Sequence, residues 1–249
     1  MTSLILLYLS ILIIFCVSLF IFWRYFFFFR KPSRTDSYEK DYILSPADGF
    51  IIYCKKIEPG QDIFSIKNYN KIRLNDLMFI DDKNLLNQSG WLIGIFMTFF
   101  DVHYNTAPIT GHILKINHDF PSTLRKNRNM LKVYKNFLLP IRQWWKNCEY
   151  IITNERASYI IKNERVSVYI TQIADSWINK IVTYKNNEQI EQGEIFGLIR
   201  MGSQVDIFIP DKNDTIEILV KERHRVKAGI TKLASLNKNG KNQQINKIG

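Results

Sequence analysis

The chain of 249 residues is long enough for one domain with a sizeable core, or for two small ones. Its 46% hydrophobic and 23% charged residues exclude wholesale disorder. The three cysteines, Cys16, Cys54 and Cys148, cannot all pair and form no CxxC motif, which excludes a disulfide-rich secreted scaffold and favours a reducing compartment.

The net charge of +11 lies at the two ends of the chain. Residues 24–34 contain four basic side chains and no acid, and residues 221–249 contain eight basic side chains and one acid. The intervening residues 35–220 carry 22 of each sign. Because this charge is terminal and no nucleic-acid recognition motif is present, we expect no nucleic-acid partner.

The first apolar segment runs from Leu4 to Trp23 and contains no charged side chain. A bilayer core of about 30 Å requires about 20 such residues in a helix. A secretory signal peptide would need basic residues before the apolar run, whereas here they follow it. A buried core helix is the alternative, but the segment is unbroken and lacks an amphipathic stripe. We therefore predict a transmembrane anchor over residues 1–30.

Basic residues flanking a membrane helix usually stay in the cytoplasm. Arg24, Arg30, Lys31 and Arg34 follow the apolar run, so we predict a single-pass protein of the cell (inner) membrane with everything beyond Arg24 on the cytoplasmic face. The aromatic residues from Trp23 to Phe29 are expected at the membrane interface, with Arg24 among the head groups.

Residues 38–236 show the pattern of a mainly β domain. Short apolar runs alternate with turn residues, as in a compact barrel or sandwich with few helices. In the run after Ser203, the side chains of Val205, Ile207 and Ile209 share one face, and Pro210 ends the strand. The expected strands are 49–54, 91–100, 158–161, 166–173, 180–184, 204–209 and 216–220.

Two stretches predict helix, at about 74–80 and about 122–146. The second is rich in Lys, Arg, Asn and Trp; it could lie on the membrane surface or be a solvated helix with two buried tryptophans. The polar, basic residues 237–249 are expected to form a disordered tail.

A Gly-Ser pair, Gly202-Ser203, stands directly before one of the predicted strands. Taken alone it is most simply a turn. Nearby Gly193 and Gly197 allow the backbone to come close to other groups, and Gly202 permits a strained peptide before Ser203. A serine on such a bond can attack the preceding carbonyl. The resulting ester breaks by β-elimination, and the new N-terminal residue loses ammonia to become a pyruvoyl group. Such a reaction needs a base and oxyanion donors.

Asp48 and His103 are the candidate helpers. Asp48 lies in SPADG (45–49) and His103 in FDVHYNTAP (100–108). Each also has a simpler interpretation: Asp48 as a turn residue before Gly49, and His103 as a hydrogen-bonded core histidine. His112 and His118 complete no recognised metal-ligand spacing with His103, so we expect no metal.

These segments together resemble phosphatidylserine decarboxylase, and in particular its short, archaeal-type form. The similar motifs occur in the family's order over roughly residues 45–231, and an N-terminal membrane segment also fits. They are SPADG (45–49), FMTFFDVHYNTAPITG (96–111), NER (154–156), QIADSWINKIV (172–182), GEIFGLIRMGSQVDIFIP (193–210) and VKAGIT (226–231).

The resemblance implies both a cofactor and a reaction. Family members cleave themselves before the serine that matches Ser203, which here would leave a β chain of 1–202 and an α chain of 203–249. Ser203 would become a pyruvoyl group that forms a Schiff base with phosphatidylserine and yields phosphatidylethanolamine and CO₂. Asp48 and His103 match the acid and histidine that activate the serine. The partners implied are the phospholipid, the membrane and the chain's own second fragment; a higher oligomer is left open.

Several positions depart from the family's pattern. Thr106 stands where long-form members have a second histidine, as is usual for the short form. Met201 and Gln204 flank Gly-Ser in place of Phe and Arg, and Asp175 replaces a glycine. Asn179 and Lys180 replace an arginine pair, so Lys180, with Asn105, is the remaining candidate for binding substrate.

A second interpretation is a non-catalytic, membrane-associated β-barrel related to biotinyl or lipoyl carriers. SPADG, the glycine spacing and VKAGIT fit such a hammerhead-like barrel. That class needs a modifiable lysine at a hairpin tip, and the sequence contains no lysine in that setting. The decarboxylase interpretation is therefore favoured.

Overall fold

The computed structural model describes residues 2–34, 39–65, 71–80, 85, 87–119, 130, 149–175, 181–200 and 203–236. The predicted helix at 122–146, apart from Met130, and the predicted tail at 237–249 lie outside these residues, as do Gly202 and Lys180.

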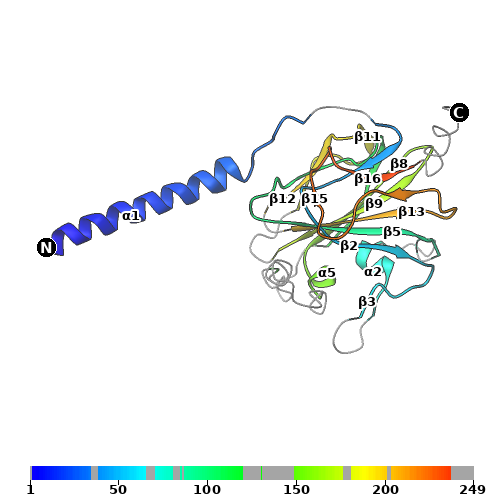
Figure 1. The fold of residues 1–249 in the computed structure, drawn as a ribbon, viewed down its shortest axis with the longest axis horizontal. Coiled ribbons are helices and arrows are strands. Elements are labelled where there is room, and N and C mark those ends of the chain that lie inside the picture. The colour runs from blue at the N-terminus through cyan, green and yellow to red at the C-terminus, as the bar shows by residue number, and fades with distance from the viewer. Residues whose placement is uncertain are drawn as a thin grey trace, which may run out of the picture.

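The N-terminal segment forms one long helix that projects from the rest of the protein (Figure 1). Helix α1 covers Thr2–Phe22, and a π-helical turn, η1, continues it over Trp23–Phe27. Within Ser3–Phe27, a stretch of 18 residues has a mean hydropathy of 3.0, and none of that stretch is buried. The predicted apolar helix is confirmed, and it is long enough to cross a bilayer.

The body of the protein is built on an eight-stranded antiparallel sheet. The strands in the middle of this sheet are largely buried, which explains their Val- and Ile-rich sequences. The order across the sheet is β11 (Glu188–Ile190), β7 (Gly111–Asp119), β8 (Arg156–Lys162), β9 (Ser167–Ala174), β13 (Ser203–Pro210), β5 (Gly90–Met97), β2 (Gly49–Ile57), β15 (Arg225–Val226).

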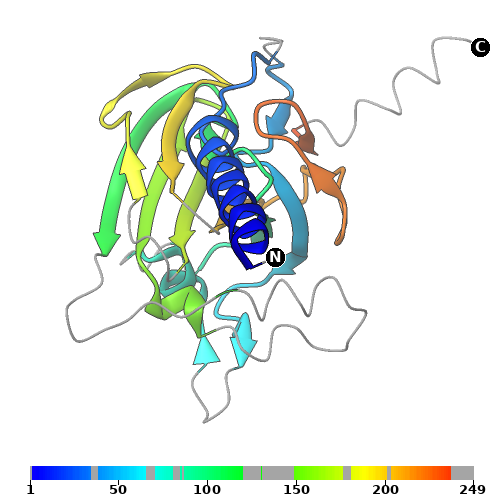
Figure 2. The ribbon, with the colours of Figure 1, turned by 90° about the vertical axis from the view of Figure 1, so that its left-hand side faces the viewer.

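Two three-stranded sheets contribute to the core on one face of this sheet. One consists of β1 (Tyr42–Leu44), β16 (Lys232–Ser235) and β14 (Glu217–Ile218), and the other of β10 (Ile181–Thr183), β12 (Ile195–Ile199) and β6 (Tyr104–Thr106). Their apolar side chains join those of the large sheet in one buried cluster that includes Ile43, Phe196 and Val205. Figure 2 shows the strands wrapping around this interior.

The opposite face of the large sheet is covered by short elements. These are α2 (Leu74–Met78), α5 (Tyr150–Thr153) and a hairpin of β3 (Phe64–Ser65) and β4 (Lys71–Ile72). Leu77, Tyr150 and Phe64 from these elements pack with Phe96 and Phe208 from the sheet. The mainly β fold with few helices is thereby confirmed.

Most predicted strands are present, with small differences in their limits. In β13, Val205, Ile207 and Ile209 enter the first core and Phe208 enters the second, as the alternation predicts. The strand predicted at 91–100 ends earlier, at Met97. The Asp101 carboxylate accepts hydrogen bonds from the backbone N–H of Thr98 at 2.8 Å and from its hydroxyl at 2.7 Å, which closes a turn there.

Candidate active site

The strand register brings the sequence motifs to one end of the large sheet. Ser203, the first residue of β13, is paired with Met97 at the end of β5 and with Ala174 at the end of β9. On the other side of β5, Phe50 is paired with Phe96. The turn that holds Asp48 and the turn that follows Met97 therefore lie close to the start of β13.

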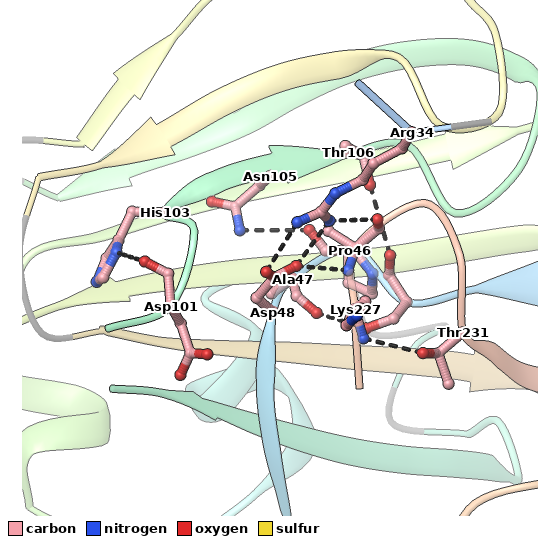
Figure 3. A network of polar contacts seen from close by, with 12 residues as sticks. Arg34, Pro46, Ala47, Asp48, Asp101, His103, Asn105, Thr106, Lys227 and Thr231 are labelled. Carbon is pink, nitrogen blue, oxygen red and sulfur yellow. Dashed lines mark hydrogen bonds and ion pairs between the residues drawn. The ribbon is translucent and has the colours of Figure 1, made fainter. Parts of the chain in front are cut away.

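His103 is fully buried in this region, between β5 and β6. Its Nδ1 lies 2.9 Å from the carbonyl oxygen of Asp101 (Figure 3). Because a carbonyl only accepts, Nδ1 carries the proton and Nε2 carries the lone pair. Within the described part of the chain, Nε2 has no hydrogen-bonding partner. Burial lowers the pKa of His103 from 6.5 to about 4, so the imidazole is neutral at physiological pH. It has the properties of a general base with an available nitrogen.

The side chain of Asp101 holds the turn that carries His103. Besides its two bonds from Thr98, it accepts one from Arg225 Nη2 at 2.5 Å, and its side chain is 1% exposed. This anchoring orients the Asp101 carbonyl, which in turn fixes the tautomer of His103.

The segment that follows helix α1 covers His103 directly. Phe28 is completely buried, and its ring stacks on the imidazole with centroids 4.1 Å apart. The guanidinium of Arg30 donates to the Phe100 carbonyl at 2.7 Å. Arg24 and Arg30 are both near enough to oppose protonation of His103 electrostatically. Phe28 was expected at the membrane interface with its neighbours, but here it packs into the protein because its ring completes the wall over His103.

Asp48 has different partners from those of His103. Its two carboxylate oxygens accept hydrogen bonds from Arg34 at 2.6 Å (Nη1) and 2.8 Å (Nη2), and the backbone N–H of Ala228 donates to Oδ1 at 2.8 Å (Figure 3). No hydrogen bond joins Asp48 to His103 among the described residues, although the carboxylate is close enough to favour protonation of the ring. The SPADG turn is thus tied to the VKAGIT turn and to the linker after the N-terminal helix.

Asn105 lies in the buried wall behind these residues. Its amide donates to the Pro46 carbonyl at 3.3 Å, and its carbonyl accepts from Gln172 Nε2 at 2.6 Å. Gln172 also lies against Gly197, where an added Cβ would come within 2.8 Å of Nε2. The contact with Gln172 explains the glycine at 197. The contact of Asn105 with substrate stays a prediction.

The backbone links His103 to the predicted cleavage site. The Ile199 N–H donates to the His103 carbonyl at 3.2 Å, and Ile199 precedes Ser203 by one short connection. On the far side of the cleavage site, the Gln204 amide accepts from the Tyr150 hydroxyl at 2.6 Å and donates to Asp206 at 2.8 Å. Hydrogen bonds therefore fix the chain both before the predicted cleavage site, at Ile199, and after it, at Gln204.

Three residues that the motifs alone did not single out contact the predicted site residues: Phe28, Arg34 and Asp101. Phe28 lies in the aromatic run predicted at a membrane interface, and Arg34 lies in the basic cluster that predicts the cytoplasmic orientation. Asp101 lies two residues before His103 in FDVH, and that spacing was the one available signal. Among the described residues, no group of three or more His, Cys, Asp or Glu side chains is arranged to hold a metal ion.

Comparison with known proteins identifies the family to which the chain belongs. Residues 21–234 match the family model for phosphatidylserine decarboxylase. A protein of Methanothermobacter thermautotrophicus assigned as an archaetidylserine decarboxylase proenzyme is 32% identical over 212 residues, covering 84% of this chain and 79% of the relative. A phosphatidylserine decarboxylase proenzyme of Carboxydothermus hydrogenoformans is 27% identical over 221 residues, covering 88% and 81%.

A further relative, from Methanocaldococcus jannaschii, is also assigned as an archaetidylserine decarboxylase proenzyme and is 33% identical over 84% of this chain and 87% of its own length. The chain belongs to the phosphatidylserine decarboxylase family. The predicted resemblance is thus confirmed.

Proposed function

We propose that the protein is a membrane-anchored decarboxylase that converts phosphatidylserine to phosphatidylethanolamine and CO₂. The observation that carries the proposal is the buried, neutral His103, whose Nε2 is free of partners among the described residues and which lies under Phe28 of the juxtamembrane segment. The segment that leaves the proposed membrane helix therefore lies directly against this histidine.

Self-cleavage between Gly202 and Ser203 would be the first task of the site. We assign His103 Nε2 as the base that removes the Ser203 hydroxyl proton while the serine oxygen attacks the Gly202 carbonyl carbon. Asp48, fixed by Arg34 and Ala228, provides the neighbouring negative charge that stabilises a protonated His103. Relatives described as proenzymes support such processing.

A pyruvoyl group derived from Ser203 would supply the electron sink for loss of CO₂. The surroundings fit a group of this kind. Residue 203 starts a central strand and is flanked by buried side chains. His103, whose Nε2 has no hydrogen-bonding partner among the described residues, lies at the same end of the sheet. His103 Nε2 would return a proton to the carbon that loses CO₂.

The proposed membrane helix would hold the site close to the bilayer in which the lipid substrate lies. The names of the relatives differ in the lipid part of the molecule but agree on serine in the head group. We assign the serine phospholipid head group as the part recognised here, and phosphatidylserine as the substrate. The proposal includes the cytoplasmic orientation, the anchor over residues 1–30, the catalytic domain over 38–236, and Asn105 and Lys180 as substrate contacts.

The intact masses of the purified chains test this proposal. Wild-type protein should give two species, 1–202 and 203–249, with the smaller one blocked at its N-terminus by a pyruvoyl group. Ser203→Ala should give one uncleaved chain without decarboxylase activity, and His103→Ala should lose activity whether or not it cleaves.

Ser167→Ala is the matched control, because Ser167 begins β9 as Ser203 begins β13. It should behave as wild type. A decarboxylase that remains active as Ser203→Ala would refute the pyruvoyl assignment. A well-folded wild-type chain that stays whole would instead favour a non-catalytic binding domain.

A further inference from the structure

Arg34 lies in the linker between the membrane helix and the first strand of the domain, yet its side chain reaches the catalytic region. Its guanidinium holds both oxygens of Asp48, and its side chain is only 16% exposed, against 11% for Asp48. A two-point contact of this kind fixes the orientation of a carboxylate as well as its place.

The same guanidinium joins three segments that are distant in sequence. Arg34 Nη1 also donates to the carbonyl of Ala228, while the N–H of Ala228 donates to Asp48. Next to this contact, Ser45 N–H donates to the Thr231 carbonyl at 2.8 Å, and Gly229 N–H donates to the Ser45 carbonyl at 2.9 Å. The linker, the SPADG turn and the VKAGIT turn therefore meet at Asp48.

A second arginine shows what an ordinary surface contact looks like in this protein. Arg165 also donates to a carboxylate near the linker, Asp41, at 2.9 Å, and to a backbone carbonyl, that of Lys40, at 3.0 Å. Its side chain is 46% exposed and that of Asp41 is 56% exposed. Exposed pairs of this type contribute little, whereas removing the partner of a nearly buried carboxylate leaves that charge poorly compensated.

We propose that Arg34 is a positioning residue for self-cleavage: it holds Asp48 in the orientation required at the active site and makes the membrane-proximal linker a part of that site. The inference rests on the proposed function, in which Asp48 assists His103 and Ser203. It goes further by assigning a catalytic requirement to a residue outside the β domain.

Self-cleavage of the full-length chain, followed by intact mass as a function of time after synthesis, tests this role. Arg34→Gln should slow the appearance of 203–249 at least tenfold, because the neutral amide cannot hold both carboxylate oxygens. Arg34→Lys should lie between Arg34→Gln and wild type, since it keeps the charge but not the planar fork. Arg165→Gln, the matched control, should cleave at the wild-type rate.

Two further measurements separate positioning from a general loss of structure. Arg34→Ala should regain cleavage when millimolar guanidinium is added, and sodium chloride at the same concentration should have no effect. Asp48→Asn should also cleave slowly, and Arg34→Gln combined with Asp48→Asn should be no slower than Asp48→Asn alone, since Arg34 acts through Asp48.

The outcomes distinguish this inference from the function on which it rests. Normal cleavage in Arg34→Gln would overturn the role of Arg34 and leave Ser203 and His103 unaffected. A double variant much slower than Asp48→Asn, or an Arg34→Ala that guanidinium does not restore, would overturn action through Asp48. Normal cleavage in Asp48→Asn would remove Asp48 itself from the site, whereas failure of wild-type protein to cleave would contradict the proposed function.

Discussion

At the scale of single residues, two fully buried titratable groups have pKa values displaced by burial. The pKa of His103 is lowered to about 4 and that of Asp206 is raised from 3.8 to about 7. Asp206 Oδ1 accepts from the Tyr53 hydroxyl at 2.5 Å and from Gln204, while Oδ2 has no hydrogen-bonding partner among the described residues. In both residues burial disfavours the charged form.

The effects of these two groups on stability have opposite signs. Between pH 6.5 and about 4 the unfolded chain protonates its histidine and the native chain does not, so the His103 contribution falls as the pH falls. Between pH 3.8 and about 7 the native chain keeps the Asp206 proton and the unfolded chain does not. The Asp206 contribution therefore falls as the pH rises.

Asp206→Asn should remove the pH dependence that Asp206 contributes and leave that of His103. The amide mimics the neutral acid and does not ionise. The free energy of unfolding of the variant, relative to that of wild type, should therefore increase by about 2–3 kcal/mol from pH 5 to pH 7. Urea unfolding of both proteins at pH 5, 6 and 7 measures this difference. A difference that does not change with pH would show that Asp206 is already ionised in the native protein.

At the scale of elements, the SPADG turn owes its shape to Gly49. Its φ is +146°, and a Cβ at this position would lie 2.2 Å from the Phe96 carbonyl oxygen. The turn therefore packs directly on β5. This contact brings Asp48 close to the start of β13, where Ser203 is the first residue.

Gly49→Ala should accordingly lower the free energy of unfolding by about 3 kcal/mol, from steric overlap added to backbone strain. Gly60→Ala is the control: its φ is also positive, at +71°, but an added Cβ would meet nothing within 4 Å. That variant should lose only about 1 kcal/mol. Thermal or urea unfolding compares them, and equal losses would contradict the role given to the Phe96 contact.

The elements that could be predicted from sequence are those determined by local patterns. The alternation in β13, the short helix near residue 74 and the apolar N-terminal helix each follow from neighbouring residues. The pairing of β6 with β12 could not be predicted, because β6 has three residues and its partner lies far along the chain. The contacts of Phe28 with His103 and of Arg34 with Asp48 were missed for the same reason: tertiary packing sets them, and no spacing encodes them.

At the scale of the whole molecule, the N-terminal helix α1 and the linker after it differ in their contacts with the β domain. The large apolar side chains of α1 are exposed along its length, whereas Phe28 is completely buried. The proposed anchoring by this helix therefore requires only an apolar surface, while the linker makes specific contacts within the protein.

Replacing residues 3–22 by a different apolar helix of equal length should leave self-cleavage and membrane attachment unchanged. Phe28→Ala in the natural chain should reduce the rate of self-cleavage several-fold, because it removes the ring that covers His103. Membrane fractionation and intact mass measure the two properties in each protein. A helix replacement that stops cleavage would show that α1 itself contributes to the site.

The position of β13 determines how the two fragments would behave after the proposed cleavage. The segment 203–236 supplies β13 to the middle of the large sheet, with β9 on one side and β5 on the other, and it supplies β15 and β16 to pairs with β2 and β1. Separating the fragments would require breaking these ladders and both cores at once. Cut protein should thus elute as a single species under native conditions and divide only in denaturant, so that one covalent bond can be lost without loss of the fold.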